Sequence, residues 1–222
     1  MKRSFINTLQ KEALSLFERY HIKLPVWGYW SLEEWKKEAD FARNVKKRQI
    51  GWDVTDFGSG NFEKCGLLLF CLRNGIHGVS GTKSYAEKLM IVRELQETPL
   101  HFHRMKEEDI INKGGGVLVM ESYKSDDKEG LSQEPLTMYV DEYPVKLKAG
   151  EPLRLNPGQS VTVPKFVYHR FYGEPGKGTV LAGEVSQVND DETDNRFYVA
   201  PGRFPAIEND EPIFKPLWTE VI

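Results

Sequence analysis

The sequence predicts a mainly β protein, a sandwich or barrel, preceded by a helical segment. From about residue 48, the chain of 222 residues becomes a series of short segments rich in β-branched and aromatic residues, such as KLMIVREL, VYHRFYG and GTVLAGEVSQV. Each segment ends at Gly, Pro, Asn or Asp, which is the pattern of short strands joined by turns. No repeating strand–helix–strand unit of roughly 30 residues is visible, which argues against a parallel α/β sheet.

We expect one domain over residues 1–222, since a chain of this length can bury a substantial core. Residues 1–47 should form helices that pack on the barrel, and residues 48–190 should form the barrel itself. The tail over residues 191–222 is rich in Asp, Asn and Pro, and it is expected to wrap around the barrel.

A first helix is predicted over about residues 3–20, because apolar residues recur there at helical spacing. These residues are Phe5, Ile6, Leu9, Ala13, Leu16 and Phe17. Their side chains form an apolar stripe that is expected to pack against the rest of the domain, with a dimer contact as the alternative.

A second helix is predicted to begin in the segment SLEEW. Ser31 as N-cap and Glu34 three residues later form the pattern of a capping box, so the helix should start there and run to about Val45. Between the two helices, the aromatic residues of LPVWGYW are expected to cover the open edge of the barrel. Stacking of Trp27 or Trp30 on a sugar ring is the alternative.

Charge and composition narrow the set of partners. The formal net charge is −3, from 30 Lys and Arg against 33 Asp and Glu, so the chain lacks the basic surface that binds nucleic acid or anionic membranes. No apolar run approaches the roughly 20 residues of a membrane-spanning helix, and the N-terminus lacks the apolar core of a signal peptide. The two cysteines would lie about 20 Å apart on an extended strand, too far for a disulfide. We therefore expect a cytoplasmic protein with free thiols.

The segment PLHFHRMKEEDIINKGGG carries a candidate metal site. On a strand, His101 and His103 project from the same face, and Glu108 follows after a short loop. A third histidine, His169, lies in VYHRF after a Pro-Gly turn and a further strand, which completes a set of three imidazoles and one carboxylate. Such a set suits a first-row divalent ion. The three glycines lack the GK[ST] ending and the following helix of a phosphate-binding loop.

This pattern resembles the two-part signature of the cupin superfamily, which implies a double-stranded β-helix, or jelly-roll barrel. The first part is H-x-H-x4-E-x6-G, and the second is P-x-G followed later by a lone histidine. The matching residues are His101, His103, Glu108 and Gly115 in the first part, and Pro157, Gly158 and His169 in the second. The sequence departs from the signature in two places. QETPL stands where a glycine usually precedes the first histidine, and more residues than usual separate Pro-Gly from the last histidine.

A narrower resemblance covers roughly residues 45–210. The segments GTKSYAEKLMIVRELQETPLHFHRMKEEDIINKGGGVLVME and GEVSQVNDDETDNRF are similar to the cupin-type D-lyxose isomerases, or D-lyxose ketol-isomerases. The resemblance implies a manganese-dependent aldose–ketose isomerase, an intramolecular oxidoreductase that interconverts D-lyxose and D-xylulose and has some activity on D-mannose and D-fructose. Such a reaction moves a proton between C1 and C2 through a cis-enediol. A six-coordinate ion with four protein ligands keeps two positions open for the sugar, which favours Mn²⁺ over Zn²⁺; Co²⁺ and Fe²⁺ are further alternatives.

Two residues are candidates for proton transfer. Lys106 lies three residues after His103, so it is near the metal whatever the loop conformation, and the resemblance implies a catalytic lysine at this position. A neighbouring cation should lower its pKa; the alternative is a solvated loop lysine. Glu184 lies in the strand segment after His169, which we expect to return by a hairpin and pair with the His169 strand. Its carboxylate faces a polar cavity as a base, or else faces solvent.

Two further residues, Lys88 and Arg203, are candidates for binding the substrate. Arg203 has a second interpretation, an ion pair with the acidic residues at 190–192.

Three other functions stay open from the sequence. A phosphosugar isomerase would use a similar ligand set but would need several cations for the phosphate, for which only Arg104, Lys106, Lys113 and Arg170 lie near enough, with Arg170 expected to point away. A dioxygenase would use the same ligands with iron. A non-catalytic sugar-binding module is the third, because the fold hosts both enzymes and binding proteins. We expect a small-molecule sugar substrate and a homodimer.

Overall fold

The computed structural model describes residues 1–191, 193–202 and 206–221. Three α-helices, α1 (Arg3–Arg19), α2 (Leu32–Lys36) and α3 (Ala39–Arg48), and the short 3-10 helix η1 (Val26–Tyr29) precede the strands. In the described residues the strands are β1 (Gly51–Thr55), β2 (Leu67–Arg73), β3 (Tyr85–Val92), β4 (His101–His103), β5 (Glu108–Gly115), β6 (Leu118–Lys124), β7 (Leu136–Val140), β8 (Tyr143–Leu147), β9 (Leu153–Leu155), β10 (Ser160–Val163), β11 (Val167–Gly173), β12 (Val180–Gln187) and β13 (Asn195–Phe197).

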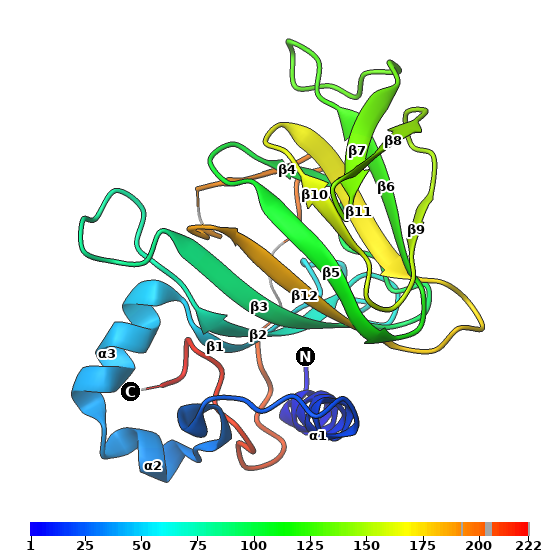
Figure 1. The fold of residues 1–222 in the computed structure, drawn as a ribbon. Helices are drawn as coiled ribbons and strands as arrows, with labels where there is room; N and C mark the ends of the chain where they lie inside the picture. Colours follow the sequence, from blue (N-terminus) through cyan, green and yellow to red (C-terminus); the bar gives the residue numbers. More distant parts are fainter. Residues whose placement is uncertain (192, 203–205, 222) are drawn as a thin grey trace.

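The strands form two antiparallel sheets that face one another (Figure 1). The large sheet has the order β1-β2-β3-β12-β5-β10-β7-β8, and the small sheet has the order β13-β4-β11-β6-β9. Buried apolar side chains of both sheets meet between them, for example Met90, Ile110 and Val180 of the large sheet against Met120 and Phe171 of the small one. Because consecutive strands such as β4 and β5 belong to different sheets, the chain crosses repeatedly between them. The predicted mainly β class and jelly-roll architecture are confirmed.

The first helix packs its apolar stripe on the outer face of the large sheet (Figure 1). Ile6, Leu9, Ala13 and Phe17 are buried against residues of β1, β2, β3 and β12, and the rings of Phe17 and Trp52 stack with centroids 6.1 Å apart. The observed bounds, Arg3–Arg19, confirm the helix predicted from the spacing.

The second predicted helix is two helices. The capping box at Ser31 and Glu34 is present, but α2 ends at Lys36 and α3 begins at Ala39. In one continuous helix, the side chains of residues 35 and 41 would point about 120° apart around the helix axis, at roughly 100° per residue. The break allows the rings of Trp35 and Phe41 to stack with centroids 5.6 Å apart and planes 10° apart. Aromatic packing therefore overrides helical continuity here.

The aromatic segment before α2 covers β1 and β2, which lie at one end of the large sheet. The ring of Trp27 stacks on Phe70 of β2 at 5.1 Å and meets Trp35 edge-on at 6.1 Å, and Trp30 packs on Trp35 at 5.0 Å. This matches the predicted edge cover. The described lining of the large cavity between the sheets contains neither Trp27 nor Trp30, so sugar stacking on them finds no support.

The C-terminal part of the chain contributes to both the small sheet and the helical face. Strand β13 pairs with β4 and so extends the small sheet beyond residue 190. Further along, the amides of Asn7 and Gln10 in α1 donate to the carbonyl oxygens of Pro212 and Lys215, at 2.9 and 3.0 Å. The assignment of residues 1–222 to one domain stays a prediction. No helix in the described parts of the chain combines the length and the apolarity needed to cross a bilayer.

Candidate functional site

Three of the five histidines converge between the two sheets. His101 and His103 project from the same face of β4, while Phe102 between them is fully buried on the other face. His169 of β11 is the direct ladder partner of His101. The ring centroids lie 4.3 to 5.5 Å apart, and one nitrogen of each ring lies within 4.8 Å of the others. These three residues can hold a metal ion.

The backbone fixes two of these rings. Nδ1 of His101 lies 2.8 Å from the carbonyl oxygen of Pro99, and Nδ1 of His169 lies 3.1 Å from that of Val167. Each of these two rings therefore directs Nδ1 toward the backbone, which leaves Nε2 available to bind an ion. Burial, followed by the neighbouring histidines, holds the pKa of His101 well below its usual value. A neutral imidazole is the form that binds metals.

Glu108, the first residue of β5, brings a buried carboxylate to the same point. Its oxygens lie 3.0 Å from Nε2 of His169 and 3.4 Å from Nε2 of His103. Burial alone would raise the pKa of this carboxyl, but Lys106 and His103 outweigh burial and hold it well below its usual value. The structure therefore brings all four predicted ligand residues together, with an ionised carboxylate beside the three rings.

Lys106 is 1% exposed, so it is not a solvated loop lysine. Its ammonium lies 2.7 Å from Glu184, 2.8 Å from Glu108 and 3.1 Å from the side-chain oxygen of Asn189. Burial would lower its pKa, but Glu108 and Glu184 outweigh that effect and raise it. The sequence-based expectation of a lowered pKa considered only a neighbouring cation and left out these two carboxylates.

Glu184 faces the same cavity but reaches it from the other sheet. The predicted hairpin with the His169 strand is wrong, because β11 lies in the small sheet while β12 pairs with β3 and β5 in the large one. The chain crosses between the sheets after Gly173 instead of turning back within one sheet. Glu184 therefore faces His169 across the barrel, and its pKa, which burial would raise, is lowered by Lys106 and Lys88.

Lys88 on β3 is buried and sits beside Glu184, its ladder partner. Its ammonium lies 3.3 Å from Glu184 and 2.7 Å from the side-chain oxygen of Asn189. Lys88 thus lines the cavity, and its role in binding the substrate stays a prediction. The other predicted substrate-binding residue, Arg203, lies outside the described residues.

A cavity of about 680 Å³ surrounds these groups. This volume is within the usual range for small-molecule sites, roughly 300–1,000 Å³. Its lining combines these charged residues with apolar side chains such as Leu67, Met90 and Phe171. Such a cavity can enclose a small polar molecule against the histidines and the buried charged side chains.

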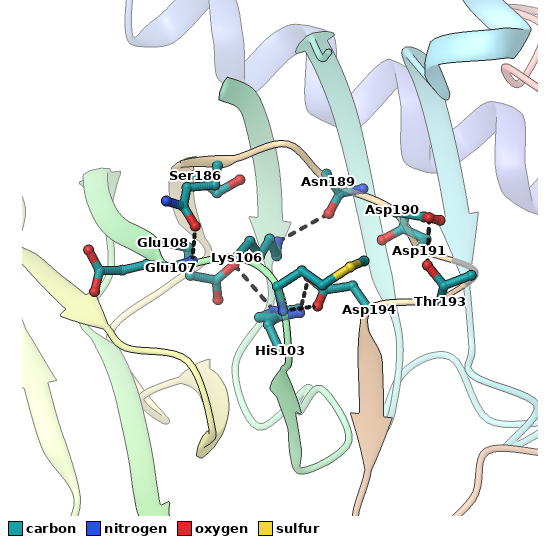
Figure 2. A network of polar contacts seen from close by, with 12 residues as sticks. His103, Lys106, Glu107, Glu108, Ser186, Asn189, Asp190, Asp191, Thr193 and Asp194 are labelled. Atoms are coloured by element: carbon teal, nitrogen blue, oxygen red, sulfur yellow. Dashed lines mark hydrogen bonds and ion pairs between the residues drawn. The ribbon is translucent and has the colours of Figure 1, made fainter. Parts of the chain in front are cut away.

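The sequence reasoning missed Ser186 near the end of β12 and two residues of the segment that follows it. Figure 2 shows Ser186, Asn189 and Asp194 around Lys106 and His103. The hydroxyl of Ser186 donates to Glu184 at 2.9 Å, and Asn189 accepts from both lysines. In SQVNDDETD, nothing separates these side chains from an ordinary polar turn, so only the fold reveals them.

The comparisons with known proteins agree with this geometry. The sequence profile of the D-lyxose isomerase family matches residues 1–221. The chain belongs to the D-lyxose isomerase family. It is 43% identical over 220 residues to the D-lyxose/D-mannose isomerase of Serratia proteamaculans, a match covering 98% of this chain and 95% of that one. It is 44% identical over 214 residues to the D-lyxose/D-mannose isomerase of Escherichia coli O157:H7, covering 96% and 94%. The predicted family and the enzyme class, an aldose–ketose isomerase, are confirmed.

The fold is also found in a solved structure. The crystal structure of the L-ribose isomerase of Acinetobacter sp. DL28 in complex with L-ribose aligns with a TM-score of 0.62 at 14% identity, covering 94% of this chain and 98% of that one. At this identity the likeness bears on the fold alone, and it agrees with the predicted cupin-type barrel of this family member.

Proposed function

We propose that this chain is a metal-dependent D-lyxose ketol-isomerase that interconverts D-lyxose and D-xylulose, and also D-mannose and D-fructose. The proton moves between C1 and C2 through a cis-enediol. One observation carries the proposal: the buried ion pair of Lys106 and Glu184, 2.7 Å apart, lies beside the three-histidine cluster in one cavity. Aldose–ketose isomerisation needs such an acid–base pair next to a Lewis acid. The family membership and the names of the relatives support the choice of sugar.

His101, His103, Glu108 and His169 are proposed to hold a divalent cation, with Mn²⁺ favoured and Co²⁺, Fe²⁺ or Zn²⁺ as alternatives. The donor set fits, because Nε2 of His169 is buried without a hydrogen-bond partner among the described residues and an ionised carboxylate lies beside it. When bound, the ion polarises the sugar carbonyl and its neighbouring hydroxyl.

The charge states of the chain's own residues suggest how the proton moves. Glu184 is ionised, since its pKa is lowered, so it can accept the proton from the sugar carbon. Lys106 is protonated, since its pKa is raised, so it can donate to the sugar oxygen. Lys88 holds the second oxygen of Glu184 and is proposed to bind a sugar hydroxyl from the same place. Arg203 remains a candidate for the same role.

The alternative functions receive less support. Two of the cations that a phosphosugar isomerase would use are engaged elsewhere, because Arg104 pairs with Glu129 at 2.5 Å and Arg170 with Glu97 at 2.7 Å. A sugar-binding module has no use for a buried acid–base pair beside metal ligands. A dioxygenase would consume oxygen and depend on iron.

The decisive experiment follows the exchanged proton. Protein stripped with a chelator and reloaded with Mn²⁺ is incubated with D-lyxose in heavy water and observed by proton NMR. We expect metal-dependent D-xylulose carrying deuterium at C1. The Glu184→Gln variant should lose this conversion, whereas Glu134→Gln, which alters the exposed partner of Lys124, should keep it. A metal-loaded protein that converts neither lyxose nor mannose would overturn the proposed function.

We further propose that the protein is a single-domain, cytoplasmic homodimer. Both cysteines are free in the structure, which suits a reducing compartment. Light scattering on the purified protein measures the oligomeric state directly, and a mass of one chain would contradict the dimer.

A further inference from the structure

The three imidazoles of the site are not oriented in the same way. His101 and His169 each place Nδ1 against the carbonyl oxygen of the residue two positions earlier, at 2.8 and 3.1 Å. The Nδ1 atom of His103 has no hydrogen-bond partner among the described residues and is buried. Its Nε2 atom faces Glu108 at 3.4 Å, on the side where the ligands converge. Something other than the backbone must therefore fix the orientation of His103.

The side chain that faces Nδ1 of His103 is Asp194, which is 1% exposed. Its Oδ2 atom lies 3.6 Å from Nδ1 and, like Nδ1, is buried without a hydrogen-bond partner in the described part of the chain. Two orphaned polar atoms that face one another are a donor and an acceptor that need only a few tenths of an ångström to reach hydrogen-bond distance.

Asp194 also holds the loop between β4 and β5. Its Oδ1 atom accepts from the backbone N–H of Met105 at 2.6 Å, and its carbonyl oxygen accepts from the N–H of Arg104 at 3.2 Å. Lys106 is the next residue of this loop, so one carboxylate touches both the ring of His103 and the segment that carries the catalytic lysine (Figure 2). Strand β13 begins at the following residue and pairs with β4, which fixes Asp194 relative to His103.

We propose that Asp194 is a positioning residue: its Oδ2 atom accepts the Nδ1 proton of His103 and so keeps the Nε2 lone pair directed at the cation. This inference rests on the proposed metal-dependent function. In metal sites, a carboxylate behind a ligating histidine selects the tautomer and the ring orientation, and its loss weakens metal binding about 10–100-fold. For His101 and His169, backbone carbonyls perform the same role.

The variant Asp194→Asn tests this without removing the loop contact. The amide oxygen can still accept from Met105, but the NH₂ group now faces Nδ1 of His103. The ring must then accept at Nδ1 and carry its proton on Nε2, the atom that should bind the ion. We expect the Mn²⁺ dissociation constant, measured by electron paramagnetic resonance of free Mn²⁺, to rise about 10–100-fold. Asp109→Asn is the matched control, because Asp109 adjoins Glu108 and bonds Thr162 outside the site.

A second measurement separates this inference from the proposed function. Nitrogen-15 shifts of the imidazoles in chelator-treated protein report the tautomer of each histidine directly. We expect His103 to carry its proton on Nδ1 in the unaltered protein and to lose that state in Asp194→Asn. Absence of Mn²⁺ binding to the unaltered protein would overturn the metal proposal and leave the tautomer as the test of Asp194. A proton on Nε2 of His103 in the unaltered protein, or equal Mn²⁺ affinity of Asp194→Asn and Asp109→Asn, would overturn the role of Asp194.

Discussion

Replacing Lys106 by methionine should separate the stability of this site from its chemistry. Lys106 is the shared cation of Glu108 and Glu184, all three being buried. The substitution keeps the approximate length of the side chain and removes only the charge. Glu184 then retains Lys88 at 3.3 Å, whereas Glu108 loses its only ammonium partner among the described residues.

The magnitude follows from burial. Removing one member of a buried ion pair leaves an uncompensated charge, which costs about 3–5 kcal/mol of unfolding free energy. Glu184→Gln should cost less, roughly 1–3 kcal/mol, because Lys106 keeps Glu108 and Asn189 as partners and Lys88 keeps Asn189. In the double variant the two effects should fall short of their sum by roughly 0.5–3 kcal/mol, since the groups are in contact.

The turnover of these variants should not follow their unfolding free energies. Each single substitution should lower kcat by about 10²–10⁴-fold, the usual effect of removing a general acid or base. The double variant should lose little more than either single variant, because residues that act as a unit are not additive. The double variant thus loses less stability than the sum of the two single losses, while its turnover stays about as low as that of either single variant.

The assay is urea unfolding of chelator-treated protein, followed by tryptophan fluorescence, with turnover measured after reloading Mn²⁺. Lys124→Met is the control, because Lys124 forms an exposed pair with Glu134 at 3.4 Å, and its loss should change stability by no more than about 0.5 kcal/mol. Equal destabilisation by Lys106→Met and Lys124→Met, or strict additivity in the double variant, would refute the idea of a coupled buried pair.

Three further outcomes are expected. Mn²⁺ at about 100 times its dissociation constant should stabilise the fold by about 2.7 kcal/mol and raise Tm by roughly 5–10 °C. In differential scanning fluorimetry, the His101→Gln variant should lose most of that rise in Tm. A full rise in Tm of this variant would count against His101 as a ligand. Burial raises the pKa of Asp53 from 3.8 to about 6, although the hydrogen bond from Trp218 acts in the opposite direction. The stability contributed by the protonated form of Asp53 should therefore be lost as pH rises from about 4 to about 6. Thermal melts of Asp53→Asn should lack this loss of stability, and a pH profile identical to that of the unaltered protein would contradict the prediction. Arg3 is fully buried and pairs with Glu220. In urea titrations, Arg3→Met should lower the unfolding free energy by about 3 kcal/mol, while turnover is retained. A loss of unfolding free energy below about 0.5 kcal/mol would show that the ion pair contributes little.

The clustering of the candidate metal ligands was predictable because their relation is local. His101 and His103 share a face through the two-residue period of a strand, which holds whatever the rest of the fold does. Glu108 follows after a loop too short to carry it far away. His169 was found through a motif, since nothing in the chain's composition says which strand lies beside β4.

Strand pairing was the part that sequence reasoning got wrong. Sequential strands are neighbours in roughly two-thirds of cases, so a hairpin between the strands of His169 and Glu184 was the natural expectation. In the jelly roll the chain changes sheets at that turn. Because side-chain alternation is the same in either pairing, the local pattern contains no information about which sheet receives β12.

The helix break between α2 and α3 has a similar origin. A capping box marks only where a helix begins, and it was read correctly at Ser31 and Glu34. The stacking of Trp35 on Phe41 depends on the shape of the surface that both rings cover. Helical propensity differs by less than about 1 kcal/mol per residue, and burying two aromatic rings outweighs that difference.

The site as a whole is made by two short segments, residues 101–108 and 184–194, with Lys88 and His169 completing it. Each segment identifies its own polar residues, but the contacts that determine charge states run between the segments: Lys106 to Glu184 across 78 positions, and Met105 to Asp194 across 89. This explains why the ligands could be predicted and the pKa of Lys106 could not. Under the proposed function, substitutions in the segment after β12 should therefore affect metal binding through His103 and proton transfer through Lys106, without altering any of the proposed ligand residues.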